Sequence, residues 1–115
     1  MDSLEIIKNA LLTVGVPVSH YEALKKPNQY IVWAEDGQGE SLWGDDQMQA
    51  QAIQGTVDYF TKTDTGNDPY VKKIQRAFNI ARVSWRLNSV QYETSTKFTH
   101  YEWVWEVPEW SEPSL

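Results

Sequence analysis

The stretch from Tyr30 to Lys62, YIVWAEDGQGESLWGDDQMQAQAIQGTVDYFTK, decides the fold because it contains two strand-like segments and the loop that joins them. Residues 30–35 are rich in β-branched and aromatic side chains, and residues 49–62 alternate apolar with polar side chains, as strands do. Residues 36–46 between them hold Gly37, Gly39 and Gly44. Glycine costs backbone entropy on ordering, so we expect this acidic loop to be mobile.

The segments on either side predict two helices and a second pair of strands. Apolar side chains recur at helical spacing within residues 2–14, and Gly15 follows the last of them. Asp68 and Pro69 form a helix start, with a capping carboxylate followed by proline at the first helical position. Residues 83–93 and 98–107 alternate in polarity across a short polar turn, which predicts a hairpin.

The resulting element order, α-β-β-α-β-β, predicts an α+β fold. We expect a mostly antiparallel sheet of four or five strands with two helices packed on one side. A fifth, short strand is expected within residues 38–45. Residues 1–107 are expected to form one domain, and residues 108–115, which contain two prolines, a loose C-terminal tail.

Composition restricts the class of protein. A chain of 115 residues is one domain, and its net charge of −6 disfavours binding to nucleic acid, which is itself an anion. The absence of cysteine excludes disulfides and thiolate chemistry and fits an intracellular context. No apolar run is long enough for a transmembrane helix, and the acidic N-terminus does not predict a signal peptide.

The motifs of common catalytic and metal sites are missing from the sequence. His20 and His100 are 80 positions apart and belong to no zinc-ligand motif. A calcium loop that started at Asp36 would need glycine and glutamate where Ser41 and Gln47 stand. No nucleophile motif or phosphate-binding glycine loop occurs. We therefore expect no enzyme activity, no cofactor and no specific metal site, and leave open weak divalent-ion binding by the exposed carboxylates.

Six Trp and six Tyr are a heavy aromatic load for this length. Tyr101, Trp103, Trp105 and Val107 alternate onto one face of the last predicted strand. Such a face either fills the core or forms an exposed surface that binds a ligand, because large aromatics dominate the energetics of both.

Charge is segregated along the chain. Residues 35–46 carry five acids and no Lys or Arg, whereas residues 72–86 carry five basic side chains and no acid. Blocks of this kind either are solvated, pair within one molecule, or attract each other across a boundary between subunits. A head-to-tail contact of the last kind closes into a ring where the rotation permits.

Several parts of the sequence together resemble the tail terminator, or tail-completion, proteins of long-tailed bacteriophages and prophages. The resemblance rests on YIVWAEDGQGESLWGDD, QAIQGTVDYFTK, the Asp-Pro helix start and HYEWVWEVP, and it extends over residues 2–108. It implies a non-enzymatic α+β subunit that assembles in the bacterial host cytoplasm, takes its place in the tail or neck of the virion, and forms a hexameric ring. The implied partners are other copies of the chain, the major tail tube protein and head–tail connector proteins, with no membrane and no sequence-specific nucleic acid. Residues 36–47 and the tail after residue 107 correspond to loops that order against the tube protein.

The charge blocks supply candidate contact residues for such a ring. On the acidic side these are Glu35, Asp36, Glu40, Trp43, Asp45 and Asp46, and on the basic side Lys72, Lys73, Arg76 and Arg82. Two other functions are compatible with the sequence. One is a minor capsid or connector-adaptor protein of the same assembly, and the other is a monomeric binding domain that uses the aromatic C-terminal hairpin.

Overall fold

The computed structural model describes residues 3–39, 51–63 and 66–109 of the chain. These residues form two helices and a five-stranded sheet, as the sequence predicts. The elements are α1 (Ser3–Leu12), β1 (Val18–His20), β2 (Gln29–Gly39), β3 (Gln51–Thr61), α2 (Pro69–Ile80), β4 (Ser84–Glu93) and β5 (Phe98–Glu109).

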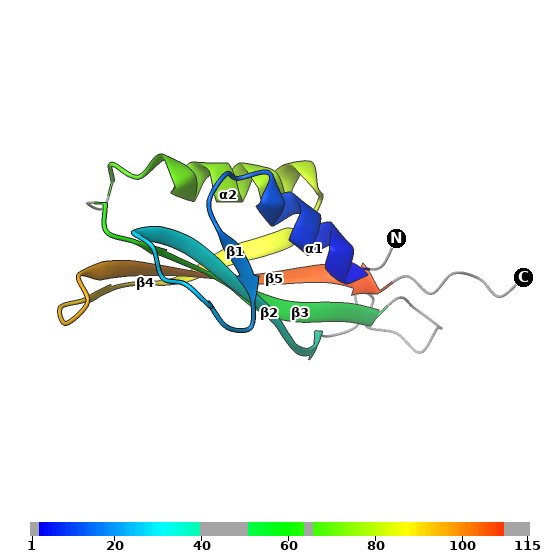
Figure 1. Cartoon of the computed structure of the whole chain (residues 1–115). Helices are drawn as coiled ribbons and strands as arrows, with labels where there is room; N and C mark the ends of the chain where they lie inside the picture. The colour runs from blue at the N-terminus through cyan, green and yellow to red at the C-terminus, as the bar shows by residue number, and fades with distance from the viewer. Residues whose placement is uncertain (1–2, 40–50, 64–65, 110–115) are drawn as a thin grey trace, which may run out of the picture.

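The sheet has the strand order β1-β2-β3-β5-β4, and both helices lie over the same face of it (Figure 1). All neighbours are antiparallel except β1, which pairs in parallel with β2. We call the face without helices the open face. The expected α+β class, with two helices on one side of a mostly antiparallel sheet, is confirmed.

The fifth strand lies in a different place from the one expected. It is β1, within residues 18–28, for which the sequence pattern predicted no strand, rather than part of residues 38–45. Residues 38 and 39 belong to β2, and residues 40–45 lie outside the described part of the chain. Three residues are too few to produce an alternating pattern, so β1 is recognisable only from its pairing with Ile31, Val32 and Trp33.

Two strands are longer than predicted. β2 continues beyond Glu35, because a bulge at Asp36 lets Gly37, Gln38 and Gly39 keep pairing with β3. The predicted loop therefore begins later than residue 36. β5 includes Pro108 and Glu109, which pair with the start of β3, so the boundary of the loose tail at residue 108 was wrong.

Both helices begin and end where local chemistry favours it. In α1 the apolar stripe is buried, and Gly15 follows the helix with a φ of 100°, a conformation that glycine adopts readily. Asp68 caps α2 by accepting a hydrogen bond from the backbone N–H of Tyr70 at 2.7 Å, and Pro69 is the first helical residue. Neither of these helices is long and apolar enough to cross a membrane.

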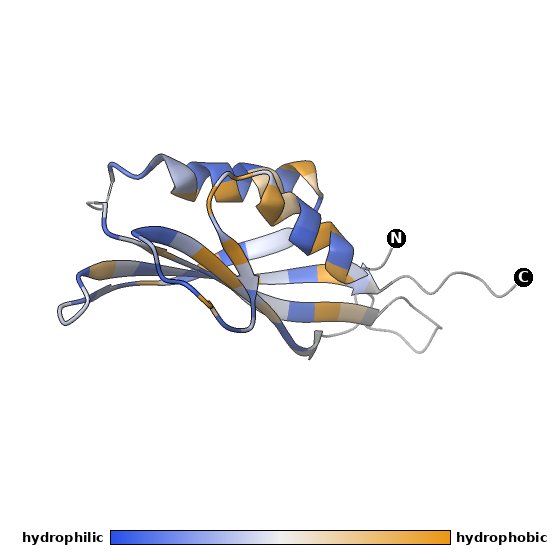
Figure 2. Cartoon of the chain, in the orientation of Figure 1, coloured by the Kyte–Doolittle hydropathy of each residue, from blue (hydrophilic) through white to orange (hydrophobic). Residues whose placement is uncertain are grey.

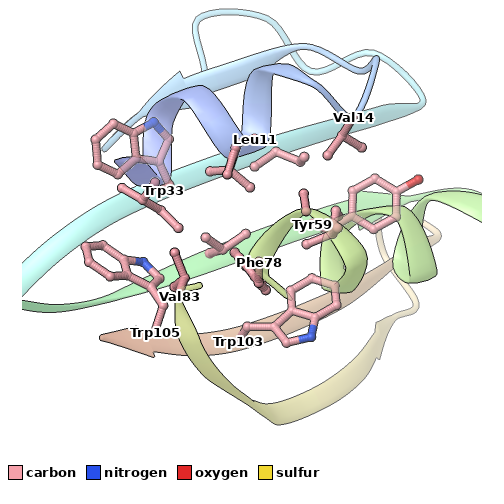
Figure 3. Close-up of a cluster of buried hydrophobic side chains, with 14 of the residues drawn as sticks. Leu11, Val14, Trp33, Tyr59, Phe78, Val83, Trp103 and Trp105 are labelled. Carbon is pink, nitrogen blue, oxygen red and sulfur yellow. The ribbon is translucent and has the colours of Figure 1, made fainter. Parts of the chain in front are cut away.

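The core lies between the helices and the sheet, and large aromatic side chains pack there among aliphatic ones (Figure 3). Trp103 and Trp105 are fully buried, and Tyr101 and Val107 are almost so. Along the strands hydrophobic and hydrophilic residues alternate, which turns one side of each strand toward the helices (Figure 2). The aromatic face of the last strand is therefore core, and a binding domain that uses this face as an exposed surface is not supported.

Position 55, at the centre of the sheet, is a glycine because no side chain fits there. It pairs with Glu35 on β2 and with Trp105 on β5. A Cβ atom at this position would collide with the backbone oxygen of Ala34 and with the indole ring of Trp105. The indole occupies the space over Gly55, so the glycine and the buried tryptophan require each other.

Replacing Gly55 with Ala should therefore destabilise the protein by about 3 kcal/mol, the upper range for overpacking a core. Gly66→Ala is the matched control, because a Cβ there meets nothing within 4 Å. Its φ of 91° should make that change cost only about 1 kcal/mol of backbone strain. Urea unfolding followed by tryptophan fluorescence measures both. Equal costs for the two variants would contradict the role assigned to Gly55.

Candidate functional site

The basic residues of the predicted interface lie together on α2. Lys72, Lys73 and Arg76 are exposed, whereas Ile74 and Phe78 of the same helix are buried in the core. Within the described part of the chain, no Lys or Arg lies within 4.0 Å of a carboxylate oxygen. The basic face of α2 is therefore not compensated by the acids that the structure describes.

Arg82 continues this basic surface beyond the end of α2. It is exposed and has a φ of 60°, and its backbone N–H donates to the carbonyl oxygen of Asn79 at 3.1 Å. This tight turn lets the chain leave the helix and enter β4 directly. Arg86 follows on β4, where its Nη1 donates to Asn88 Oδ1 at 3.0 Å.

The acidic residues of the predicted interface are only partly described. Asp36 is exposed at the bulge of β2, and Glu35 before it is half-buried. The other four candidates, Glu40, Trp43, Asp45 and Asp46, lie outside the described residues.

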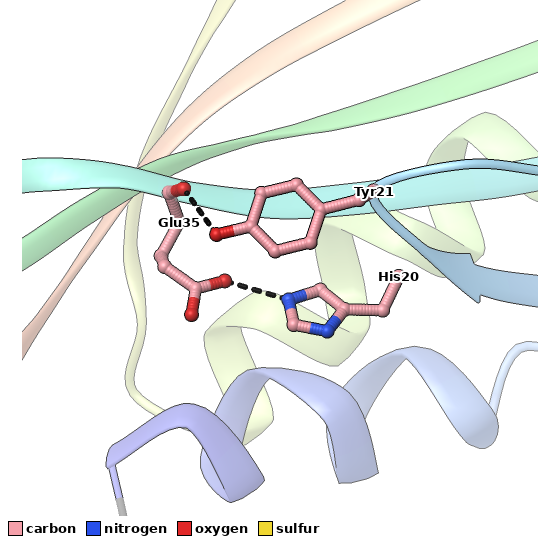
Figure 4. A network of polar contacts seen from close by, with 3 residues as sticks. All are labelled: His20, Tyr21 and Glu35. Atoms are coloured by element: carbon pink, nitrogen blue, oxygen red, sulfur yellow. Dashed lines mark hydrogen bonds and ion pairs between the residues drawn. The ribbon is translucent and has the colours of Figure 1, made fainter.

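Glu35 makes its contacts inside the molecule. Its Oε1 accepts a hydrogen bond from His20 Nε2 at 2.6 Å, and its backbone oxygen accepts one from the Tyr21 hydroxyl at 3.1 Å (Figure 4). The imidazole of His20 stacks on Trp33, with 4.0 Å between ring centroids. Burial raises the pKa of Glu35, but its hydrogen bonds, including that from His20, outweigh burial and hold the pKa below its ordinary value.

A second polar cluster, which sequence reasoning did not identify, lies on the open face. Asp58 of β3 and Glu102 of β5 are directly opposite each other, and His100 precedes Glu102 by two residues on the same face. His100 Nε2 donates to Asp58 Oδ1 at 2.7 Å, and Asn88 Nδ2 of β4 donates to Glu102 Oε1 at 2.7 Å. One ligand-type atom from each of Asp58, His100 and Glu102 lies within 4.8 Å of the others. We call these three residues the open-face triad.

The electrostatics of this cluster centre on its imidazole. The hydrogen bond to Asp58 raises the pKa of His100, whereas burial lowers it. The negative charges of Asp58, Glu102 and Glu93 act in the same direction as the hydrogen bond. The pKa of His100 is therefore above its ordinary value, which favours the protonated ring beside the two facing carboxylates.

A groove of about 510 Å³ runs beside the open-face triad. His100 stacks on Phe60 with 4.3 Å between centroids, and Phe60 stacks on Tyr30 at 4.8 Å. The segment after β1 forms the opposite wall. The residues that line the groove are Tyr21, Glu22, Ala23, Lys26, Tyr30, Val32, Asp58, Phe60, Glu93, Thr96, Phe98 and His100.

Strand alternation already placed His100, Glu102 and Asp58 on polar faces of their predicted strands. What the sequence did not contain was the pairing of β3 with β5, which joins positions 42 residues apart. An expected hairpin between residues 83–93 and 98–107 pairs β5 only with β4. The triad is therefore a product of the sheet order.

No protein-family model matches the chain, and no curated protein sequence is significantly similar to it. Its function has to be inferred from the residues and their arrangement.

The contact between Glu35 and His20 predicts a pH-dependent contribution to stability. The folded-state pKa of Glu35 lies below the unfolded value of about 4.3. The contribution is therefore present above about pH 4.3 and is lost as the pH falls through the lowered pKa of the folded protein. Glu35→Gln should lower the free energy of unfolding by about 0.5 kcal/mol at neutral pH, a value discounted for solvent screening, and by less in acid.

Urea unfolding at a series of pH values measures this difference. Glu22→Gln, which removes an exposed carboxylate from the nearby connection, is the matched control and should show no such trend. A destabilisation by Glu35→Gln that grew as the pH fell would contradict the assignment.

Proposed function

We propose that the chain is a structural subunit of a tailed bacteriophage or prophage, a tail terminator or head–tail joining protein that forms a homo-oligomeric ring. The resemblance of residues 2–108 to that family supports this function. The α+β fold is the kind of subunit that the resemblance implies. In this role the chain caps the tail tube and contacts the major tail tube protein and the head–tail connector proteins.

The observation that carries the proposal is the uncompensated basic face of α2. Lys72, Lys73 and Arg76 are exposed, and none of them lies within 4.0 Å of a carboxylate in the part of the chain that the structure describes. Side chains of this kind are available to acids on another molecule. A neighbouring copy offers exposed Asp36 and the acids that follow it in the sequence.

The basic face of α2 and the described acid Asp36 lie toward different edges of the sheet, which supports a head-to-tail contact. α2 is followed directly by β4 at one edge of the sheet and packs against it, whereas Asp36 lies on β2, next to the opposite edge. Contacts between different flanks of successive copies are heterologous, and contacts of that type generate rings where the rotation closes. A two-fold dimer formed through the basic face of α2 alone would instead bring like charges together.

Charge alone supplies orientation more than affinity. An exposed ion pair contributes about 0 to 1 kcal/mol, and salt at physiological strength screens charges beyond about 8 Å. Stable assembly therefore also needs apolar contact between copies. Ile80 at the end of α2 is 76% exposed, and Leu12 at the end of α1 is 57% exposed. These side chains give the surface around the helix ends an apolar component.

Reversing Lys73 and Arg76 to Glu should therefore weaken assembly. The loss of two favourable pairs at each interface, with repulsion in their place, should lower the apparent association constant at least tenfold, equivalent to about 1.4 kcal/mol. Light scattering coupled to size exclusion, over a range of protein and salt concentrations, measures the species present. The unmodified chain should give a discrete oligomer near six subunits that dissociates at high salt, and the variant should stay smaller.

A control variant with Lys25 and Lys97 changed to Glu carries the same change in net charge at exposed positions away from α2. It should assemble like the unmodified chain. An unmodified chain that is monomeric at every concentration and salt would sink the ring, as would equal effects of the two double variants.

A further inference from the structure

We propose that Asp58, His100 and Glu102 bind a divalent first-row transition metal ion on the open face of the sheet. Each residue offers one ligand atom, and the three atoms lie within 4.8 Å of one another. The proposal rests on the geometry of this face and does not depend on ring assembly.

A cation site needs an excess of negative charge, and the register between β3 and β5 supplies it. Asp58 and Glu102 are direct cross-strand partners. Like charges at such positions repel, because their Cβ atoms are only about 5 Å apart. Among the described residues, the ring of His100 is hydrogen-bonded to Asp58 and not to Glu102. A dication held between the three side chains offsets both carboxylates.

The distances are close to those of a coordination shell. Ligand atoms about 2.1 Å from a tetrahedral zinc ion are about 3.4 Å from one another. The Nε2 of His100 and the Oδ1 of Asp58 are 2.7 Å apart, since they share a proton, and the third atom lies within 4.8 Å. The three side chains project from paired strands, so the required change in spacing falls on side-chain torsions. On binding, the ion takes the lone pair of Nε2, and the proton that Nε2 held is released to solvent.

Groups around the triad orient its ligands. Asn88 donates to Glu102 at 2.7 Å, and Arg86 in turn donates to Asn88 at 3.0 Å. The ladder between β4 and β5 shifts register between Leu87 and Ser89, which leaves Asn88 as the extra residue of a bulge, and bulges re-aim side chains. Stacking on Phe60 fixes the ring plane of His100. Outer-shell contacts of this kind are typical of metal sites.

The ligand set selects the class of ion. One imidazole and two carboxylates, without a thiolate, suit Zn²⁺ or Mn²⁺ better than Cu⁺, which prefers sulfur. A tetrahedral ion with three protein ligands keeps its fourth position for water, and two of the three residues line the groove described above. The chain has no zinc-ligand motif because the proposed ligands come from two strands that are distant in the sequence.

The test uses the full chain, stripped of metal with a chelator and titrated with ZnCl₂ by calorimetry and with MnCl₂ by nuclear magnetic resonance. We expect one Zn²⁺ per chain. Mn²⁺, which is paramagnetic, should broaden the signals of residues around Asp58, His100 and Glu102 first. Glu102→Gln preserves shape and removes a ligand charge, and it should weaken Zn²⁺ binding at least tenfold.

The matched control is His20→Gln, which removes the other histidine of the chain and its contact with Glu35. Binding in this variant should equal that of the unmodified protein. Spectra of both variants report whether each is folded, and Asp58→Asn replaces Glu102→Gln if the latter is not. The proposal is overturned by no detectable Zn²⁺ binding at millimolar concentration, by equal affinity in the ligand variant, or by Mn²⁺ broadening confined to the acidic residues 36–46.

Discussion

The pairing of β3 with its two neighbours is the constraint on which the other features depend. β3 lies between β2 and β5, and its register with β5 is continuous from Gln51 to Thr61. This register turns Val57 and Tyr59 toward the helices and Asp58 toward the open face. A slip by one residue would exchange the two faces, bury a carboxylate and expose the aromatics. Gly55 beneath the Trp105 indole opposes such a slip, because the other residues of β3 have a Cβ atom.

The same strand also positions the basic helix. The Tyr59 hydroxyl donates to Asp68 Oδ2 at 2.8 Å, while Oδ1 of that carboxylate caps α2. Burial first, and then the negative charge of Asp68, raise the pKa of Tyr59, so the phenol keeps its proton and remains a donor. One carboxylate therefore ties the start of α2 to the centre of the sheet. The orientation of Lys72, Lys73 and Arg76 follows from this contact, although none of them takes part in it.

Much of the fold was predictable from local pattern, and the exceptions have physical causes. The helices, the aromatic core face and the β4–β5 hairpin follow from periodicity and capping, which act over a few residues. β1 was missed because three residues carry no period. The extension of β2 was missed because Gly37 and Gly39 disfavour strands, whereas their pairing with β3 overrides that preference. The open-face triad could not be predicted without the sheet order, because its residues come together only where β3 pairs with β5. The last strand was predicted to end before Pro108, although Pro108 pairs opposite Ala52.

In the described part of the chain, the histidines and the Lys and Arg side chains differ in their partners. Both ion pairs there use histidine, His20 with Glu35 and His100 with Asp58, and none uses Lys or Arg. Histidine carries a small aromatic ring beside its nitrogen donors, and here that ring stacks on Trp33 or Phe60. The compensation of Asp58 depends on pH, because the hydrogen bond to Asp58 raises the pKa of His100 and the ring loses its charge as the pH rises through that pKa. The permanently charged side chains stay at the surface, where ionic strength governs their attraction to a partner. A pH rise through the raised pKa of His100 should therefore act first on the sheet, and salt first on assembly.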